Sequence, residues 1–107
     1  MNQELLVKLM VDAKLKLRIH TDAFNEEISD LISAAAADLV RHNACQETHL
    51  NGTTVDPLVK RAILTFVRAY FGQPDDQERL QKDYENQKAM LMTTSGYTDW
   101  GNINGQI

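Results

Sequence analysis

Residues 56–72 read DPLVKRAILTFVRAYFG and carry the strongest helix pattern of the chain. Asp56 can cap the first turn, Pro57 suits the first helical position, and Gly72 is a residue type that ends helices. Apolar side chains cover at least half of this helix: Leu58, Val59, Ala62, Ile63, Leu64, Phe66, Val67, Tyr70 and Phe71. A helix so broadly apolar must contact several others. We therefore predict an all-α fold, a small bundle of about four helices built around residues 56–71.

A second helix is predicted before this segment, from Thr21 or Asp22 to about His42. Either residue can accept a hydrogen bond from the first-turn amides, and the following acidic residues suit the helix dipole. Its apolar side chains recur at helical spacing and would pack against those of the central helix. The residues predicted to form the core are Ile28, Leu31, Leu39, Ile63, Phe66 and Val67.

The first predicted helix, from about Gln3 to Leu17, has two apolar faces. One arc can face the core and contains Leu5, Leu6, Leu9, Met10, Ala13 and Leu17. Val7, Val11 and Leu15 form a separate row at i, i+4 and i+8. A helix with two apolar faces needs two partners, so we predict that this second row is a contact between subunits. Alternation over residues 15–19 also allows an extended end to this helix.

The last predicted helix begins at residues 74–76 and reaches about Met92. Its apolar stripe is thin, consisting of Leu80, Tyr84 and Leu91, so we expect it to lie on the outside of the bundle. Between the second and third helices the pattern breaks over residues 43–55. Asn51 and Gly52 both tolerate positive φ, which favours a small hairpin or an ordered loop there.

Composition and charge place the chain among small proteins with one core. It has 107 residues, 43% of them apolar, and a net charge of −4 with a pI near 5.2. No apolar run approaches the ~20 residues of a membrane span, and the N-terminus lacks a basic secretory start. A single cysteine, Cys45, excludes an internal disulfide and fits a reducing compartment such as the cytosol.

Metal binding and nucleophilic catalysis have one candidate segment. His42, Cys45 and His49 are three potential zinc ligands, and Glu47 could be a fourth. No sequence signature of a cysteine hydrolase surrounds Cys45. We favour a polar helix end with a structural thiol, and we expect no catalytic residues, no metal and no cofactor.

DNA readout by a helix-turn-helix is a competing hypothesis. However, about a dozen residues separate the second and third helices, whereas that motif needs a short turn. The basic residues are also scattered along an acidic chain, and nucleic-acid affinity comes largely from clustered cations.

The C-terminal residues combine three glycines with large apolar side chains. We divide the chain into a helical domain, residues 1–94, and a tail, residues 95–107. Tyr97, Trp100 and Ile103 are spaced three apart, and aromatic residues commonly anchor proteins to partners. We predict that this tail docks on a partner and becomes ordered there.

The order of these elements resembles the head-tail connector (adaptor, or head-completion) proteins of tailed bacteriophages. The resemblance runs from about Leu5 to Tyr97 and is carried by residues 14–22, 26–35, 56–70, 83–85 and 95–97. His20 departs from the family pattern, in which an acidic residue is frequent at this place. Residues 43–55 have no residue-by-residue match, and their role is left open.

This resemblance implies a virion protein, made in the host cytoplasm and located at the capsid vertex. Members form a ring of about twelve copies beneath the portal, where they extend the DNA channel and carry the stopper or tail-completion proteins. DNA would pass through without specific binding, and no membrane is involved. The portal is the partner implied for the tail. The alternatives are a small helical DNA-binding transcriptional regulator and a small metal-dependent hydrolase.

Overall fold

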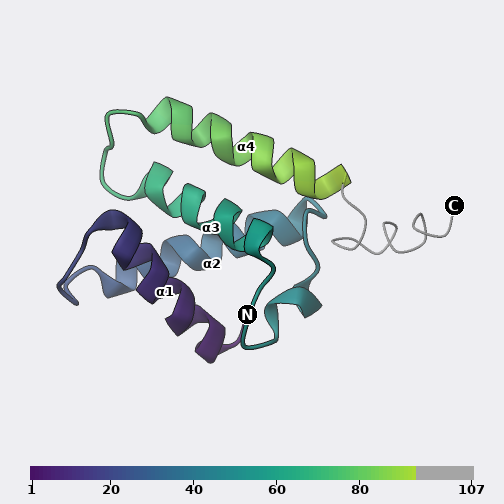
Figure 1. Cartoon of the computed structure of the whole chain (residues 1–107), viewed down its shortest axis with the longest axis horizontal. Helices are drawn as coiled ribbons and strands as arrows, with labels where there is room; N and C mark the ends of the chain where they lie inside the picture. Colours follow the sequence, from purple (N-terminus) through teal and green to yellow (C-terminus); the bar gives the residue numbers. More distant parts are fainter. Residues whose placement is uncertain (94–107) are drawn as a thin grey trace, which may run out of the picture.

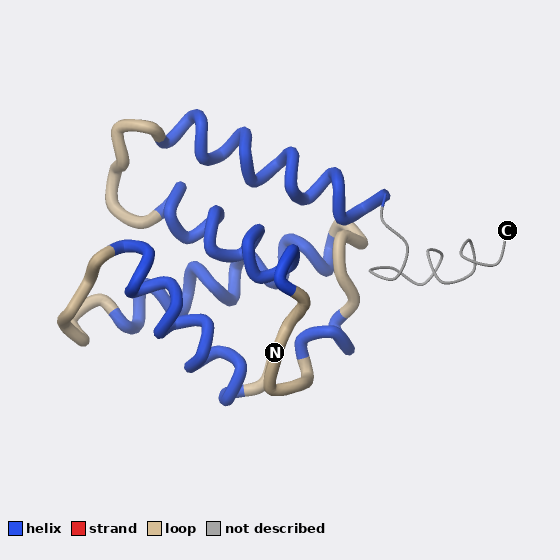
Figure 2. Tube along the Cα trace, viewed as in Figure 1, coloured by secondary structure: helices blue, strands red, loops and turns tan. Residues whose placement is uncertain are grey.

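The computed structural model describes residues 1–93, which form four α-helices and one short 3₁₀ helix. The elements are α1 (Gln3–Leu17), α2 (Asn25–Arg41), the 3₁₀ helix η1 (Glu47–Leu50), α3 (Pro57–Tyr70) and α4 (Gln77–Thr93). This part of the chain contains no strand (Figure 2). The predicted all-α bundle of about four helices is confirmed.

Helix α3 is the central element, and it packs against α1, α2 and α4. In Figure 1 it runs between α1 and α4, with α2 behind it. Asp56 caps it by accepting a hydrogen bond from the Leu58 amide at 2.8 Å, and Pro57 occupies the first turn. After the helix, Gly72 adopts a φ of +64°, a conformation that L side chains rarely take. The predicted start and end signals of this helix are confirmed.

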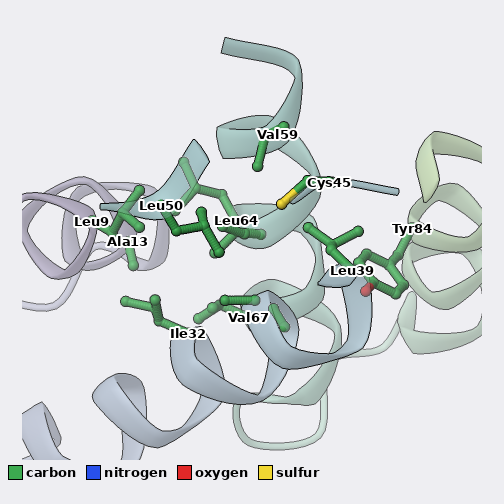
Figure 3. Close-up of a cluster of buried hydrophobic side chains, with 14 of the residues drawn as sticks. Leu9, Ala13, Ile32, Leu39, Cys45, Leu50, Val59, Leu64, Val67 and Tyr84 are labelled. Carbon is green, nitrogen blue, oxygen red and sulfur yellow. The ribbon is translucent and has the colours of Figure 1, made fainter. Parts of the chain in front are cut away.

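The core lies around α3 and draws side chains from every helix (Figure 3). Four of the six predicted core residues, Ile28, Leu39, Ile63 and Val67, are fully buried. Leu31 and Phe66 are only half-buried, which corrects the prediction. Phe66 packs beside the rings of Tyr70 and Tyr84, with centroids 4.5 and 5.1 Å away, at the edge of the core.

Helix α1 continues to Leu17, so the alternative of an extended end is wrong. Arg18 follows it in the left-handed conformation with φ 58°. The amide of Arg18 then donates to Leu15 O at 3.2 Å, and that of Ile19 donates to Lys14 O at 2.9 Å. These two bonds form a Schellman motif, which satisfies carbonyls that the end of a helix leaves without partners.

Helix α2 begins at Asn25, three residues later than predicted, and its cap position is Phe24. Neither predicted cap residue serves α2. The Asp22 carboxylate binds Lys14 Nζ of α1 at 2.9 Å, and Thr21 Oγ1 accepts a hydrogen bond from the Ala23 amide. The Asp22 carboxylate therefore binds α1 instead of capping the first turn of α2.

The segment between α2 and α3 is an ordered loop containing η1, so the hairpin alternative is wrong. Ala44, Cys45 and Leu50 are buried in the core, which fixes this loop against the helices. Gln46 and His49 complete a capping box at the start of η1.

Helix α4 packs on α3 and uses the predicted stripe of Leu80, Tyr84 and Leu91, all buried. Sequence reasoning missed a fourth buried side chain, Lys88, which is 8% exposed. Its ammonium group lies 2.9 Å from the carboxylate of Asp38 on α2. A buried lysine requires such a partner because burial disfavours an isolated charge.

Asp38 joins α2 to α4 through two hydrogen bonds. It accepts one from the Tyr84 hydroxyl at 2.6 Å and one from Lys88 Nζ at 2.9 Å. Burial alone would raise the pKa of Asp38, but the bonds from Tyr84 and Lys88 outweigh it and hold this pKa below its usual value. Burial, together with the bond to Asp38, raises the pKa of Tyr84.

We expect Ile63→Ala to reduce the free energy of unfolding by about 2–5 kcal/mol, because it leaves a cavity at a fully buried site. Leu58→Ala, on the same helix but 42% exposed, is the matched control and should cost less than about 1 kcal/mol. Urea denaturation measures both values. Equal losses would contradict the described orientation of α3.

We expect Asp38→Asn to cost about 1–3 kcal/mol at neutral pH, because it removes the charged partner of buried Lys88. The pKa of Asp38 is lower in the folded state than in the unfolded state. Its contribution is therefore complete above about pH 4 and is lost as the pH falls through the folded pKa. Below pH 4 the variant should lose stability less steeply than the wild type.

Urea denaturation across a pH series tests this expectation. Glu85→Gln is the control, since Glu85 also contacts Lys88 but its side chain is largely exposed. It should leave the neutral-pH stability nearly unchanged. Identical acid slopes for Asp38→Asn and the wild type would show that Asp38 has no stabilising partner.

Candidate functional site: the outer row of helix α1

Val7, Val11 and Leu15 form an exposed apolar row along α1, here called the outer row. Their side chains are 48%, 55% and 67% exposed. The opposite side of the same helix is buried and carries Leu5, Leu9 and Ala13. The helical period explains this separation, because residues at i, i+4 and i+8 remain on one side. The two apolar faces expected from the sequence are therefore present, and the outer one has no partner among residues 1–93.

Three charged side chains next to the outer row bind other parts of the subunit. Lys14 pairs with Asp22, and Asp12 pairs with Lys60 of α3 at 2.6 Å. Lys8 Nζ donates a hydrogen bond to Thr53 O at 3.0 Å. Because these contacts hold the three charged groups away from the outer row, its apolar side chains remain accessible to another protein surface.

The N-terminus of α1 is braced by the loop that follows η1. The Asn2 side chain accepts a hydrogen bond from the Leu5 amide at 2.8 Å, which caps the helix. Its amide nitrogen donates to Asn51 O and Gly52 O at 2.6 and 3.0 Å. The loop at residues 43–55, whose role the sequence left open, thus fixes the orientation of α1. The sequence offers only Asn2 itself, a residue type that can cap a helix. It gives no sign of the hydrogen bond from Asn2 to Asn51, which is 49 residues away.

Other large apolar side chains are exposed, but they differ from the outer row. Phe24 stacks edge-on against Phe71, with ring centroids 5.5 Å apart, and Tyr70 lies against Phe66. These rings contact each other at the ends of helices. Singly exposed apolar residues are normal on protein surfaces. Three exposed aliphatic side chains in one helical row form a more continuous apolar surface.

His42, Cys45 and His49 do not form a metal centre in the structure. His42 Nδ1 lies 2.9 Å from Asp38 O, and His49 Nδ1 accepts a hydrogen bond from the Gln46 amide at 3.2 Å. Cys45 is buried, and burial raises the pKa of its thiol to about 11, so it is not a thiolate at neutral pH. Within residues 1–93, no three His, Cys, Asp or Glu side chains are placed to hold a metal ion.

Two further observations limit what this part of the chain offers. None of the helices in residues 1–93 is long and apolar enough to cross a membrane. The predicted docking residues Tyr97, Trp100 and Ile103 lie outside the described residues.

An apolar helix face exposed in a small bundle is typical of a surface that binds another protein. A comparison with known protein families identifies the family of this chain. The chain matches the family described as phage connector protein over residues 9–98, and it belongs to that family. No curated protein and no solved structure matches it.

Membership confirms the resemblance drawn from the sequence. It gives the chain a general role as a structural connector in a phage particle, acting together with other virion proteins. A structural family of this kind is typically not enzymatic.

Proposed function

We propose that the chain is a head-tail connector that forms a ring of about twelve copies beneath the portal. The ring extends the DNA channel and joins the capsid to the stopper or tail proteins. The observation that supports this proposal most is the exposed outer row of α1 in a member of the phage connector family.

The outer row supplies one side of the contact between neighbouring subunits. Val7, Val11 and Leu15 lie on a helix held at both ends, by the Asn2 cap and by the Schellman motif at Arg18. Such a rigid face can be buried without ordering new backbone, which keeps the entropic cost of association low. Complete burial of each side chain is worth up to about 1.5–3 kcal/mol, less the part already buried. The contact is repeated at every subunit of the ring.

The tail residues Tyr97, Trp100 and Ile103 attach the ring to the portal. Two parts of the chain thus have different partners: the helices contact neighbouring subunits, and the tail contacts the portal. The net charge of −4 fits a DNA conduit, because an acidic wall repels the duplex and lets it slide.

We expect Val11→Asp to prevent ring assembly while leaving the subunit folded. A carboxylate at this position would have to be desolvated in the subunit contact, whereas in the free subunit it stays in water. Because Val11 is 55% exposed, the free energy of unfolding should change by less than about 1 kcal/mol. Sedimentation velocity with portal present measures assembly, and urea denaturation measures stability.

Leu58→Asp is the matched control, since Leu58 is an exposed aliphatic residue on α3 outside the outer row. It should assemble like the wild type. If Val11→Asp unfolds the subunit, the row belongs to the core. If it assembles normally, the row is not a subunit contact.

Deleting residues 97–107 should abolish attachment to the portal and leave the helical domain intact. The core described within residues 1–93 precedes this segment. We therefore expect unchanged helix content and an unfolding free energy within about 0.5 kcal/mol of the wild type. Circular dichroism and co-sedimentation with purified portal provide the two readouts. A truncated chain that still binds the portal would show that another surface makes this contact.

A further inference from the structure

The outward side of α3 forms a groove lined by basic residues and closed on one side by α1. The hollow has a volume of 280 Å³. Lys60, Arg61 and Arg68 come from α3 and Lys16 from α1, while Leu64 and Thr65 are buried beneath them. No acidic residue lines it. Three of the four cations share α3, and the packing of α1 on α3 adds Lys16 to them.

Two of these four cations lack a counter-charge within the described fold. Lys60 pairs with Asp12, and Arg68 interacts electrostatically with Asp76. Lys16 and Arg61 are exposed and form no ion pair among residues 1–93. Two unpaired cations in one groove, on a chain of net charge −4, favour an anionic partner there.

Helix α2 carries an exposed acidic surface in its N-terminal half. Glu26, Glu27 and Asp30 are exposed and form no ion pair with any residue of 1–93. The exposed side chains of Ala34 and Ala37 follow further along the same side of α2. Helix α2 lies behind α3 in Figure 1, and it contributes no residue to the groove.

We propose that the acidic surface of α2 docks into the basic α3 groove of a second copy of this chain. This inference rests on the proposed ring-forming connector and names the charged part of its subunit contact. The basic groove lies on α3 and α1, whereas the acidic surface lies on α2, so a contact between them joins two different surfaces head to tail. Such contacts produce closed rings when the rotation between copies closes. Charge complementarity also rejects a copy in the reversed orientation.

The groove and the outer row belong to neighbouring parts of the surface. Leu15, the last residue of the outer row, directly precedes Lys16 at the groove. Duplex DNA is the competing occupant. It is less favoured because firm DNA binding usually neutralises several phosphates at once, and here two unpaired cations stand on an acidic chain.

Two charge-reversed variants test the proposal. In one, Lys16→Glu and Arg61→Glu make the groove acidic; in the other, Glu27→Lys and Asp30→Lys make the α2 surface basic. None of these four side chains has an ion pair within residues 1–93. Reversing them therefore breaks no described contact of the free subunit. Asp75→Lys with Glu78→Lys is the control, with the same change of charge at exposed positions near the start of α4.

Sedimentation velocity over a range of protein concentrations measures self-association at low salt. Each reversed variant should associate at least about tenfold more weakly than the wild type, because attraction becomes repulsion across the contact. An equimolar mixture of the two should recover association, since the acidic groove of one matches the basic α2 of the other. The control should associate like the wild type, and added salt should weaken the wild type.

Failure of the mixture to recover association overturns the proposal, as does a wild type that stays monomeric to millimolar concentration. If groove variants lose binding to a fluorescein-labelled DNA duplex but still self-associate, the groove is a DNA site instead. Co-sedimentation with the portal separates this test from the connector function. If the chain binds the portal and its charge variants self-associate like the wild type, then the chain is a connector that lacks the charged contact between α2 and the groove.

Discussion

Burial of the apolar side of α3 against three other helices is the contact on which the rest of the structure depends. Ile63 and Val67 have no solvent exposure, and α1, α2 and α4 each use an apolar side to cover them. A chain of 107 residues can build one such core. Once α3 is covered, the second apolar face of α1 has nothing left to pack against among residues 1–93.

This constraint also determines how charge is distributed on the surface. One solvent-exposed side of α3 carries its basic residues, and the packing of α1 adds Lys16 to the same groove. The outward side of α2 carries Glu26, Glu27 and Asp30. The packing of the four helices thus gives the subunit an apolar outer row on α1, a basic groove at α3 and an acidic surface on α2. A subunit with three such different surfaces is suited to directional assembly.

Local signals allowed much of the fold to be predicted from the sequence. The bounds of α1, the Asp56–Pro57 start and the Gly72 stop depend on neighbouring residues, so helical periodicity and capping rules were sufficient. The start of α2 was misplaced because Asp22 binds Lys14 of another helix. The loop bonded to Asn2, the Lys88–Asp38 pair and the basic groove all join residues far apart in sequence. No periodicity reports such contacts before the helices are packed.

Our central proposal is that the exposed surfaces of this subunit join copies into a ring on the portal. The most direct test is the mass of the complex formed by the full chain and the purified portal of the same phage, measured by native mass spectrometry. We predict a discrete complex that carries about twelve copies of the chain per portal ring, without intermediate occupancies at saturation. A portal that binds none, or that binds independent copies in a continuous distribution, would contradict this proposal.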